Sequence, residues 1–357
     1  MGRAHAIAIR AFGGFDLVAA ADPSPNARKE MQKVADTTPL FASADEMLQK
    51  ERPDLVVVAT PALYHCEPTI AALRAGAHVL CEKPFAVTLE EADRMIDTAN
   101  SAGRMLLVDH QFRIHPRAQA ALRLVRDGAI GDVIALRGGA KQNFSGSEIL
   151  ENGTHVFDLA MLFAGTPLWV SSAITVQNRP ATVADIVDSK TVARLPSGLV
   201  VGERIHATIG FEKGTVLNAE FLGVYSGFYL QIIGAQGSLY VPLGANPGTA
   251  FLSRKSYANP NDPQSGWQPV SVELGKWGQQ QNPFTYELWA QWLTNPDKQP
   301  MGIDGKHPMD ANNGRRAIEI VHAVFESHFQ ESRRVALPMP QRDHPLERRL
   351  QALKQKA

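Results

Sequence analysis

The sequence has few of the residues that mark specialised classes of protein. Its two cysteines, Cys66 and Cys81, provide neither a disulfide framework nor a cysteine-based zinc site. Lys and Arg together number 36, as do Asp and Glu, so the formal net charge is 0. This balance gives no electrostatic basis for binding nucleic acid or a membrane surface. No apolar run approaches the ~20 residues needed to cross a bilayer. We therefore expect neither kind of partner.

Other signals are missing as well. The first residues lack the uninterrupted apolar core of a signal peptide because Arg10 breaks it, so the cytoplasm is the expected location. No compact ligand set predicts a catalytic metal. What remains is 44% hydrophobic and 20% charged, as is typical of a soluble globular protein. A length of 357 residues predicts two domains, each with its own core.

Residues 1–113 alternate between helix-like and strand-like segments. Buried-type strands are predicted at 16–21, 54–59, 79–81 and 105–108. Thr88 and Glu91 form a capping-box pattern at the start of one intervening helix, and Gly103 follows its end. Strands alternating with helices at this spacing predict a parallel, doubly wound Rossmann-type sheet.

Residues 114–340 have a different pattern. Longer β-type runs are predicted at 133–137, 169–177, 186–194, 200–209, 216–222, 229–234 and 238–242. Several alternate apolar and polar residues, which is typical of an antiparallel sheet with one exposed face. Residues 246–281 suggest a long loop, 311–329 a helix and 341–357 a charged tail. We expect an α+β second domain built on a large, mainly antiparallel open sheet.

The segment Glu82-Lys83-Pro84 directly follows the predicted strand 79–81. A charged side chain at such a strand end lies where doubly wound sheets bind their ligands. Proline also restricts the backbone of the residue before it, here Lys83. The alternative is a surface salt bridge at the strand exit.

Asp22 ends the first predicted strand. A carboxylate there can bind both ribose hydroxyls of NAD, although Arg28 nearby leaves NADP open, and turn capping is the structural alternative. A dinucleotide-binding unit also opens with a strand and G-x-G-x-x-G before its first helix. Gly2 could be only the last of those glycines, so the first strand is missing. Either the sequence starts late or the phosphate loop has been lost.

Seven short motifs follow one another along the chain. They are Gly2-Arg3-Ala4-His5-Ala6, Ala59-Thr60-Pro61, Glu82-Lys83-Pro84, Gln111–Pro116, Gly128–Val133, Gly153-Thr154-His155-Val156-Phe157-Asp158 and Ile233–Leu239. In this order, over about residues 2–337, they resemble the glucose-fructose oxidoreductase/inositol dehydrogenase family, also called Gfo/Idh/MocA.

The resemblance implies an NAD(P)-dependent oxidoreductase. Such an enzyme moves hydride between a nicotinamide and a CH–OH group of a sugar, polyol or related small molecule. The resemblance also implies a homodimer or homotetramer formed through the exposed face of the second sheet. Two alternatives use the same scaffold: a catalytically silent sensor or regulator, which a missing phosphate loop favours, and an NAD-assisted glycoside hydrolase.

The resemblance also assigns roles to residues. Lys83 would point at the reacting hydroxyl and His155 would move its proton, with Glu151 as a third catalytic candidate where many family members carry Asp. An imidazole suits this proton transfer, and an ammonium can stabilise alkoxide character. The alternative for His155 is a capping or buried structural histidine. Cofactor contacts are predicted for Gly2, Asp22, Thr60, Pro61, His65, Glu82, Lys83 and Gln111. Substrate contacts are predicted for Lys83, Arg113, His155 and Asp158.

Overall fold

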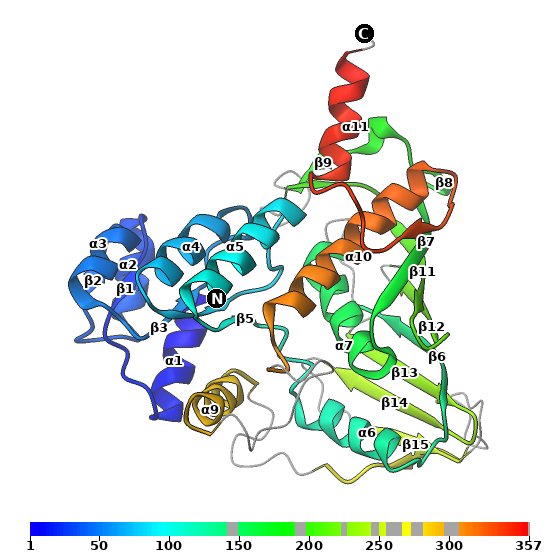
Figure 1. Ribbon diagram of the computed structural model, residues 1–357, viewed down its shortest axis with the longest axis horizontal. Coiled ribbons are helices and arrows are strands. Elements are labelled where there is room, and N and C mark those ends of the chain that lie inside the picture. The colour runs from blue at the N-terminus through cyan, green and yellow to red at the C-terminus, as the bar shows by residue number, and fades with distance from the viewer. Residues whose placement is uncertain are drawn as a thin grey trace.

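A computed structural model gives the arrangement of the chain in two regions, an amino-terminal one (residues 1–113) and a carboxyl-terminal one (from residue 114). It describes residues 1–140, 149–189, 198–222, 227–243, 250–254, 266–272, 281–295 and 307–355. Figure 1 shows the helices and short strands of the amino-terminal region on one side and the large sheet of the carboxyl-terminal region on the other. No helix in these ranges is both long enough and apolar enough to span a membrane.

The amino-terminal region alternates helices and strands as predicted. Its strands are β1 (Ala20–Ala21), β2 (Leu40–Phe41), β3 (Leu55–Val58), β4 (His78–Cys81) and β5 (Leu106–Val108). Its helices are α1 (Gly2–Phe12), α2 (Pro25–Gln32), α3 (Ala44–Glu51), α4 (Cys66–Arg74) and α5 (Leu89–Ala102), with a 3-10 turn η1 (Ala62–Tyr64). Every strand pair is parallel, which confirms the doubly wound class.

Strand β4 is buried on both faces. Val79 and Cys81 pack in one apolar cluster with residues of α4 and α5, whereas Leu80 packs in a second cluster with residues of α1. Successive side chains of a strand point to opposite faces, so a short apolar run fills both layers of the core. The end of β4 is thereby fixed from both sides.

The parallel strands form two separate sheets. β1 pairs with β2, while β3, β4 and β5 form a three-stranded sheet, and within the described ranges no strand joins β1 to β3. Doubly wound sheets run in the order 3-2-1-4-5-6. These numbers give the order of the strands along the chain. β2, β1 and β3 correspond to strands 3, 2 and 4 of that order, so the place between β1 and β3 is the one that strand 1 takes. Among the described residues, no strand occupies that position.

The carboxyl-terminal region is built on a 10-stranded sheet. Its strands are β6 (Val133–Gly139), β7 (Pro167–Val176), β8 (Arg179–Pro180), β11 (Arg204–Phe211), β12 (Val216–Phe221), β13 (Phe228–Gly234), β14 (Ser238–Leu243), β15 (Phe251–Ser253), β16 (Gln268–Pro269) and β17 (Val335–Ala336). The order is β16-β15-β14-β13-β6-β12-β11-β7-β17, with β8 beside β7. All of these pairs are antiparallel except β6–β12, which confirms the mainly antiparallel sheet. β9 (Val187–Asp188) and β10 (Leu199–Val200) pair separately.

Helices cover one face of this sheet. They are α6 (Pro116–Arg126), α7 (Thr154–Ala164) and α10 (Ala311–Phe329), and a π-helical turn η2 (Ile149–Gly153) leads into α7. Every residue of α7 is buried because the helix packs against both the sheet and α10, which itself lies on β7 (Figure 1). The predicted helix at 311–329 is confirmed. At its amino end Gly314 lies so close to Val108 of β5 that a Cβ would be 2.7 Å from a Val108 methyl. α10 therefore abuts the parallel sheet as well.

Three features of the structure were not predicted from the sequence. α9 (Gln281–Thr294) is a helix that returns to the amino-terminal region, where Trp289 packs in the same cluster as Ile9 of α1 (Figure 1). The predicted charged tail contains α11 (Pro345–Lys354), anchored by fully buried Leu346. β1 covers only two of the six residues predicted as a strand. Packing between segments far apart in the sequence decides all three cases.

Two other predictions fall largely outside the described residues. They are much of the predicted loop at 246–281 and the end of the predicted strand at 186–194. Within 246–281, the described residues include the short strands β15 and β16.

The capping box predicted for α5 is present and can be tested. Glu91 N donates to Thr88 Oγ1 at 3.1 Å, and Thr88 N donates to Glu91 Oε2 at 3.1 Å. We expect Thr88→Ala to lower the free energy of unfolding by about 1 kcal/mol, because the Glu91 backbone amide in the first turn of the helix loses its acceptor. Chemical denaturation measures the change. Thr98→Ala on the same helix is the control, since Thr98 only donates to the Arg94 carbonyl, and equal losses in both variants would contradict the capping role.

Candidate active site

Lys83 and Glu151, predicted from separate motifs, meet between the two sheets. Lys83 Nζ donates to the Glu151 backbone carbonyl at 3.0 Å and lies 3.3 Å from Glu151 Oε2. Their side chains are 19% and 13% exposed. Lys83 follows the carboxyl end of β4, and Glu151 lies in η2. The contact therefore connects the ligand-binding edge of the parallel sheet to the turn that precedes His155.

His155 lies in the first turn of α7 and is buried against aromatic rings. Its ring centroid is 4.6 Å from that of Phe112, 5.4 Å from His110 and 5.6 Å from Phe228. Nδ1 of His155 has no hydrogen-bond partner among the described residues. Burial lowers the pKa of His155 well below its usual value, and the charge of Lys83 lowers it further. The imidazole is therefore neutral at physiological pH and able to accept a proton.

Packing explains the glycine of the Gly153-x-His155 motif. A Cβ at Gly153 would lie 2.8 Å from Ile149 Cγ1 and 3.1 Å from Phe221 Cζ. Only a residue without a side chain lets η2 approach β12 this closely. The glycine thus allows the turn that carries Glu151 and leads to His155 to pack closely against β12.

Arg113 and Asp158, both predicted to contact substrate, are instead bonded to each other. Arg113 Nε donates to Asp158 Oδ2 at 2.9 Å and Arg113 Nη2 donates to the Asp158 carbonyl at 2.6 Å. Both side chains are buried, and a buried charge requires such a partner. His110 Nδ1 lies 3.7 Å from Asp158 Oδ1. The pair fixes the junction after β5 to α7, and its predicted contact with substrate stays a prediction.

A buried network that sequence reasoning missed lies beneath Lys83. It contains His5 of α1, Glu82, Asp109 and Tyr286 of α9. His5 Nε2 is 2.9 Å from Glu82 Oε1, and His5 Nδ1 is 2.8 Å from the Tyr286 hydroxyl. Lys83 N donates to Glu82 Oε2 at 3.1 Å. Both Glu82 oxygens are thus engaged, and Glu82 holds the backbone of Lys83; its predicted contact with the cofactor stays a prediction.

The electrostatics of this network are uneven. Burial opposes ionisation of Glu82, but the hydrogen bond to His5, the charges of His5 and Lys83 and the Lys83 backbone amide together outweigh it and lower the pKa of Glu82. Burial likewise opposes a charged His5, but Glu82 and Asp109 together raise the pKa of His5. Burial, with the charge of Glu82, raises the pKa of Asp109 to about 7. His5, Glu82 and Asp109 form the one group in the described ranges whose ligand atoms lie within 4.8 Å of one another. Of the three, only His5 and Glu82 are hydrogen-bonded to each other, while Asp109 Oδ2 lies 3.9 Å from His5 Nε2.

His65, predicted to touch the cofactor, joins two loops instead. Its Nε2 faces the Thr60 carbonyl at 2.8 Å and its Nδ1 faces the Pro84 carbonyl at 2.9 Å. Burial works against a charged ring, but Cys81 and the carbonyl groups outweigh it and raise the pKa of His65 to about 9. Both ring nitrogens face backbone carbonyls, which gives His65 a structural role, and its predicted contact with the cofactor stays a prediction. His65 thereby positions the loop after β3 against the loop that carries Lys83.

The other predicted cofactor residues lie at or near the same edge of the sheet. Asp22 follows β1, is half-buried, and accepts from Ser24 N through Oδ1 at 2.8 Å. Thr60 and Pro61 are exposed after β3. Gln111 Oε1 is buried without a partner in the described part of the chain. Gly2 begins α1, whose N-cap makes no side-chain hydrogen bond.

Comparison with known proteins agrees with this arrangement. Residues 1–110 match the family model described as "Oxidoreductase family, NAD-binding Rossmann fold". Residues 137–337 match "Oxidoreductase family, C-terminal alpha/beta domain" of the same family. The chain belongs to the Gfo/Idh/MocA oxidoreductase family.

Several proteins similar to this chain have named activities. It is 30% identical over 166 residues to D-glucoside 3-dehydrogenase of Escherichia coli K12, covering 43% of this chain and 47% of that protein. It is 30% identical over 250 residues to levoglucosan dehydrogenase of Pseudarthrobacter phenanthrenivorans, covering 62% of this chain and 64% of that protein. The chain thus matches about half to two thirds of these relatives' lengths.

Solved structures share the fold of the whole chain. Levoglucosan dehydrogenase in complex with NADH and levoglucosan superposes with a TM-score of 0.72 at 22% identity, covering 95% of this chain and 96% of that one. An oxidoreductase from Agrobacterium radiobacter in complex with NAD+, L-tartaric acid and magnesium gives 0.73 at 18% identity, covering 94% and 95%. The Gfo/Idh/MocA member described here therefore has the two-part architecture of these structures.

The raised pKa of Asp109 predicts a pH-dependent stability. The folded protein holds a proton on Asp109 up to about pH 7, whereas an unfolded carboxyl releases it near its usual pKa of 3.8. This contribution to stability is present at low pH and is lost as pH rises through about 7. We expect the unfolding free energy of Asp109→Asn, minus that of wild type, to increase between those pH values. Denaturation at several pH values measures the difference. The exposed Asp97→Asn is the control, and parallel curves for wild type and Asp109→Asn would contradict the assignment.

Proposed function

We propose that this protein is an NAD(P)-dependent oxidoreductase that transfers hydride between the nicotinamide and a CH–OH group of a sugar, polyol or related small molecule. The observation that carries the proposal is the contact of Lys83 with Glu151. It holds an ammonium group at the carboxyl edge of the parallel sheet, next to the segment that presents neutral His155. Oxidation of an alcohol needs both a proton acceptor and a group that stabilises the developing alkoxide.

Each residue has a separable task in this reaction. When bound, the nicotinamide supplies or accepts the hydride. Lys83 Nζ stabilises negative charge on the substrate oxygen, and Glu151 orients that ammonium through its carbonyl and carboxylate. His155 takes up the hydroxyl proton, and no residue that the structure describes holds its tautomer through a hydrogen bond to Nδ1. The surrounding Phe112 and Phe228 rings exclude water from this proton.

The residues present suit a dinucleotide. The Asp22 carboxylate can accept hydrogen bonds from the adenosine ribose, which favours NAD. Arg28 Nη1 is held on the Asp22 carbonyl at 2.7 Å, so a cation also lies near the position of a 2′-phosphate. The unpartnered Gln111 Oε1 can accept from a carboxamide. Thr60 and Pro61 lie exposed along the same edge and add surface for the cofactor.

The substrate class rests on the relatives. Those named above are dehydrogenases of glucosides and levoglucosan, and a further relative, 31% identical over 197 residues, is a D-apiose dehydrogenase of Paraburkholderia graminis. We therefore propose a carbohydrate or polyol substrate. We also propose a homodimer or homotetramer formed through the sheet face opposite α7 and α10, where Tyr229 and Tyr240 stack with centroids 5.8 Å apart.

The first test concerns Lys83. Substrates are sought by incubating the protein with NAD+ or NADP+ and panels of glycosides, anhydro-sugars and polyols while following nicotinamide reduction. On any substrate found, Lys83→Ala should lower kcat/KM by roughly 10²–10⁴-fold while NADH affinity changes little, because alkoxide stabilisation is lost. Lys50→Ala is the matched control, since Lys50 forms an exposed ion pair with Glu46. Unchanged turnover in Lys83→Ala would reject the mechanism. Cofactor binding without hydride transfer to any substrate would favour a silent regulator.

The second test concerns Asp22. Asp22→Asn should weaken NADH binding by about tenfold, because hydrogen bonds to a charged acceptor are lost, while NADPH binding should stay equal or improve as repulsion of the 2′-phosphate is removed. Fluorescence titration of the nicotinamide measures both affinities. The exposed Asp16→Asn serves as the control. An equal loss for NADH and NADPH would contradict recognition of the ribose by Asp22.

A further inference from the structure

We propose that the segment between β17 and α11, residues 337–344, is a strap that positions Lys83, with Arg342 as its key residue. The strap belongs to the carboxyl-terminal region but binds the start of α5 in the amino-terminal region. Lys83 lies a few residues before that helix, so the strap sets where its ammonium meets Glu151. The clamping itself needs no activity, whereas its effect on turnover rests on the proposed function.

The strap completes the amino-terminal cap of α5. The first amides of any α-helix have no partner within the helix. Here the Leu89 and Glu90 amides both donate to the backbone carbonyl of Arg342, at 3.0 and 3.1 Å. The next amide, that of Glu91, donates to Thr88 Oγ1 at 3.1 Å. A helix of one region is thus capped by the backbone of the other.

The strap is fixed to α10 on both sides of this carbonyl. Before it, Met339 is buried and its amide donates to Glu319 Oε1 at 2.9 Å. After it, His344 is buried against His322 of α10, with ring centroids 5.2 Å apart. Figure 1 shows α11 beginning where α5 and α10 lie side by side. The Arg342 carbonyl therefore stands on a firm support.

Four charged side chains join the strap, α5 and α10. Asp93 of α5 forms an ion pair with Arg315 of α10, and its Oδ2 lies 3.3 Å from Arg342 Nε. Glu319 of α10 accepts from Arg315 Nη1 at 3.0 Å and lies 3.7 Å from Arg342 Nη1. Two carboxylates thus alternate with two guanidinium groups. Such a network holds its geometry better than an isolated surface pair does.

The residues between Lys83 and α5 transmit this constraint. All of residues 84–87 are buried. The Val87 carbonyl faces His322 Nε2 at 3.0 Å, and a Cβ at Gly198 would lie only 3.1 Å from Val87 Cγ1. Gly198 directly precedes β10, which α11 contacts. Because a close-packed segment does not deform independently, a shift at the start of α5 also moves Lys83.

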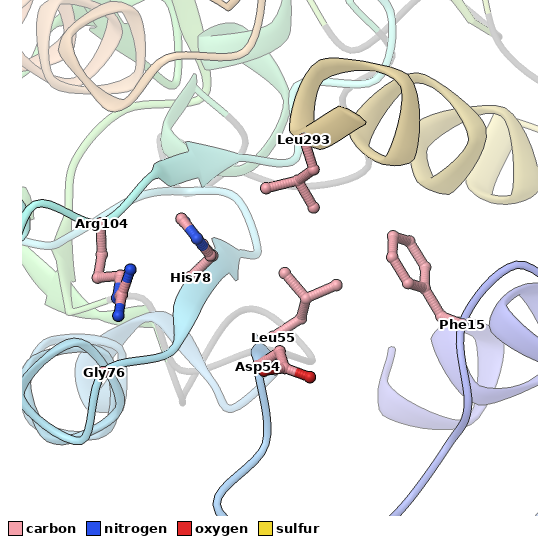
Figure 2. A pocket seen from close by; sticks show the side chains of 7 residues that line it. All are labelled: Phe15, Asp54, Leu55, Gly76, His78, Arg104 and Leu293. Atoms are coloured by element: carbon pink, nitrogen blue, oxygen red, sulfur yellow. The ribbon is translucent and has the colours of Figure 1, made fainter. Parts of the chain in front are cut away.

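The opposite ends of the same strands are packed less closely. A cavity of about 310 Å³ lies there, and its lining includes Phe15, Leu55, Leu293 and Arg104. Figure 2 shows the Phe15, Leu55 and Leu293 side chains around one open space, so β3 and the end of α9 are separated at this point. The position of the strand ends that carry the site is therefore set at the strap, away from this cavity.

The experiment compares three variants of the whole chain. Arg342→Ala removes the ion pairs of an exposed side chain and keeps the backbone carbonyl. Arg342→Lys retains the positive charge. Arg104→Ala is the matched control, since Arg104 is also exposed but lines the cavity at the other end of the sheet.

Two readouts are independent of any activity. Hydrogen exchange at the Leu89 and Glu90 amides reports the cap of α5. The rate at which acetic anhydride acetylates Lys83, followed by mass spectrometry, reports how firmly Glu151 holds the ammonium. The exposed Lys50 serves as an internal reference for the reagent.

In Arg342→Ala we expect exchange to become roughly fivefold faster and acetylation of Lys83 roughly threefold faster, because the strap loosens. Arg342→Lys should recover part of both changes, and Arg104→Ala should show neither. Faster exchange with unchanged acetylation would overturn the proposal, since the strap would then only cap α5. Equal changes in Arg104→Ala would also overturn it, because they would indicate a general loosening.

Turnover is read separately. On a substrate found by the screen described above, Arg342→Ala should lower kcat about tenfold and leave the KM of the cofactor unchanged, because a displaced Lys83 stabilises the alkoxide less well. An unchanged kcat would overturn the positioning of Lys83. If no substrate is turned over by the wild-type protein, the proposed function fails, and exchange with acetylation still decides whether the strap holds Lys83.

Discussion

The bond between Lys83 and Glu151 is the contact on which the proposed chemistry depends. It joins the end of a parallel strand to a turn 68 residues later, in the region built on the other sheet. A lysine at a strand exit would ordinarily be solvated and contribute little as an ion pair. Here both side chains are mostly buried, so removing either partner leaves an uncompensated charge at the centre of the site.

Two buried networks hold the groups on either side of this bond. His5, Glu82 and Tyr286 fix the backbone of Lys83 from beneath, through α1 and α9. Arg113 and Asp158 fix the segment that carries His110 and Phe112 against α7. The first network limits where the ammonium can lie and the second limits where the His155 ring can lie. Preorganisation of this kind is what electrostatic stabilisation of a transition state requires.

Local structure was predictable where local interactions decide it. The Thr88 capping box, the apolar strand β4 and the helix at 311–329 follow from short-range pattern and are confirmed. The motifs around Lys83, Glu151 and His155 also selected residues that the fold brings together. Shared sequence order carried that prediction, because no spacing rule alone relates positions 83 and 151.

The rest depended on contacts between distant segments. α9 buries its apolar residues against α1, a contact that the local sequence does not reveal. α11 is held by ion pairs with distant residues, such as that of Arg348 with Glu326. Whether a polar residue contacts a ligand or another part of the protein also depends on residues far away in the sequence. His65, Glu82, Arg113 and Asp158 all lie in or near motifs typical of a binding site, and each is hydrogen-bonded to another part of the protein. The fate of a buried donor or acceptor is set by its neighbours in space.

The central claim, hydride transfer at the Lys83–His155 site, is tested most directly by following the hydrogen itself. A sugar substrate carrying deuterium on the carbon to be oxidised is incubated with oxidised cofactor in ordinary water, and the reduced nicotinamide is analysed by mass spectrometry and NMR. Direct transfer predicts one deuterium on the nicotinamide ring in every turnover, with its appearance slowed in Lys83→Ala and His155→Asn. Reduced nicotinamide that carries hydrogen from water, or deuterium transfer unaffected by both substitutions, would contradict the account.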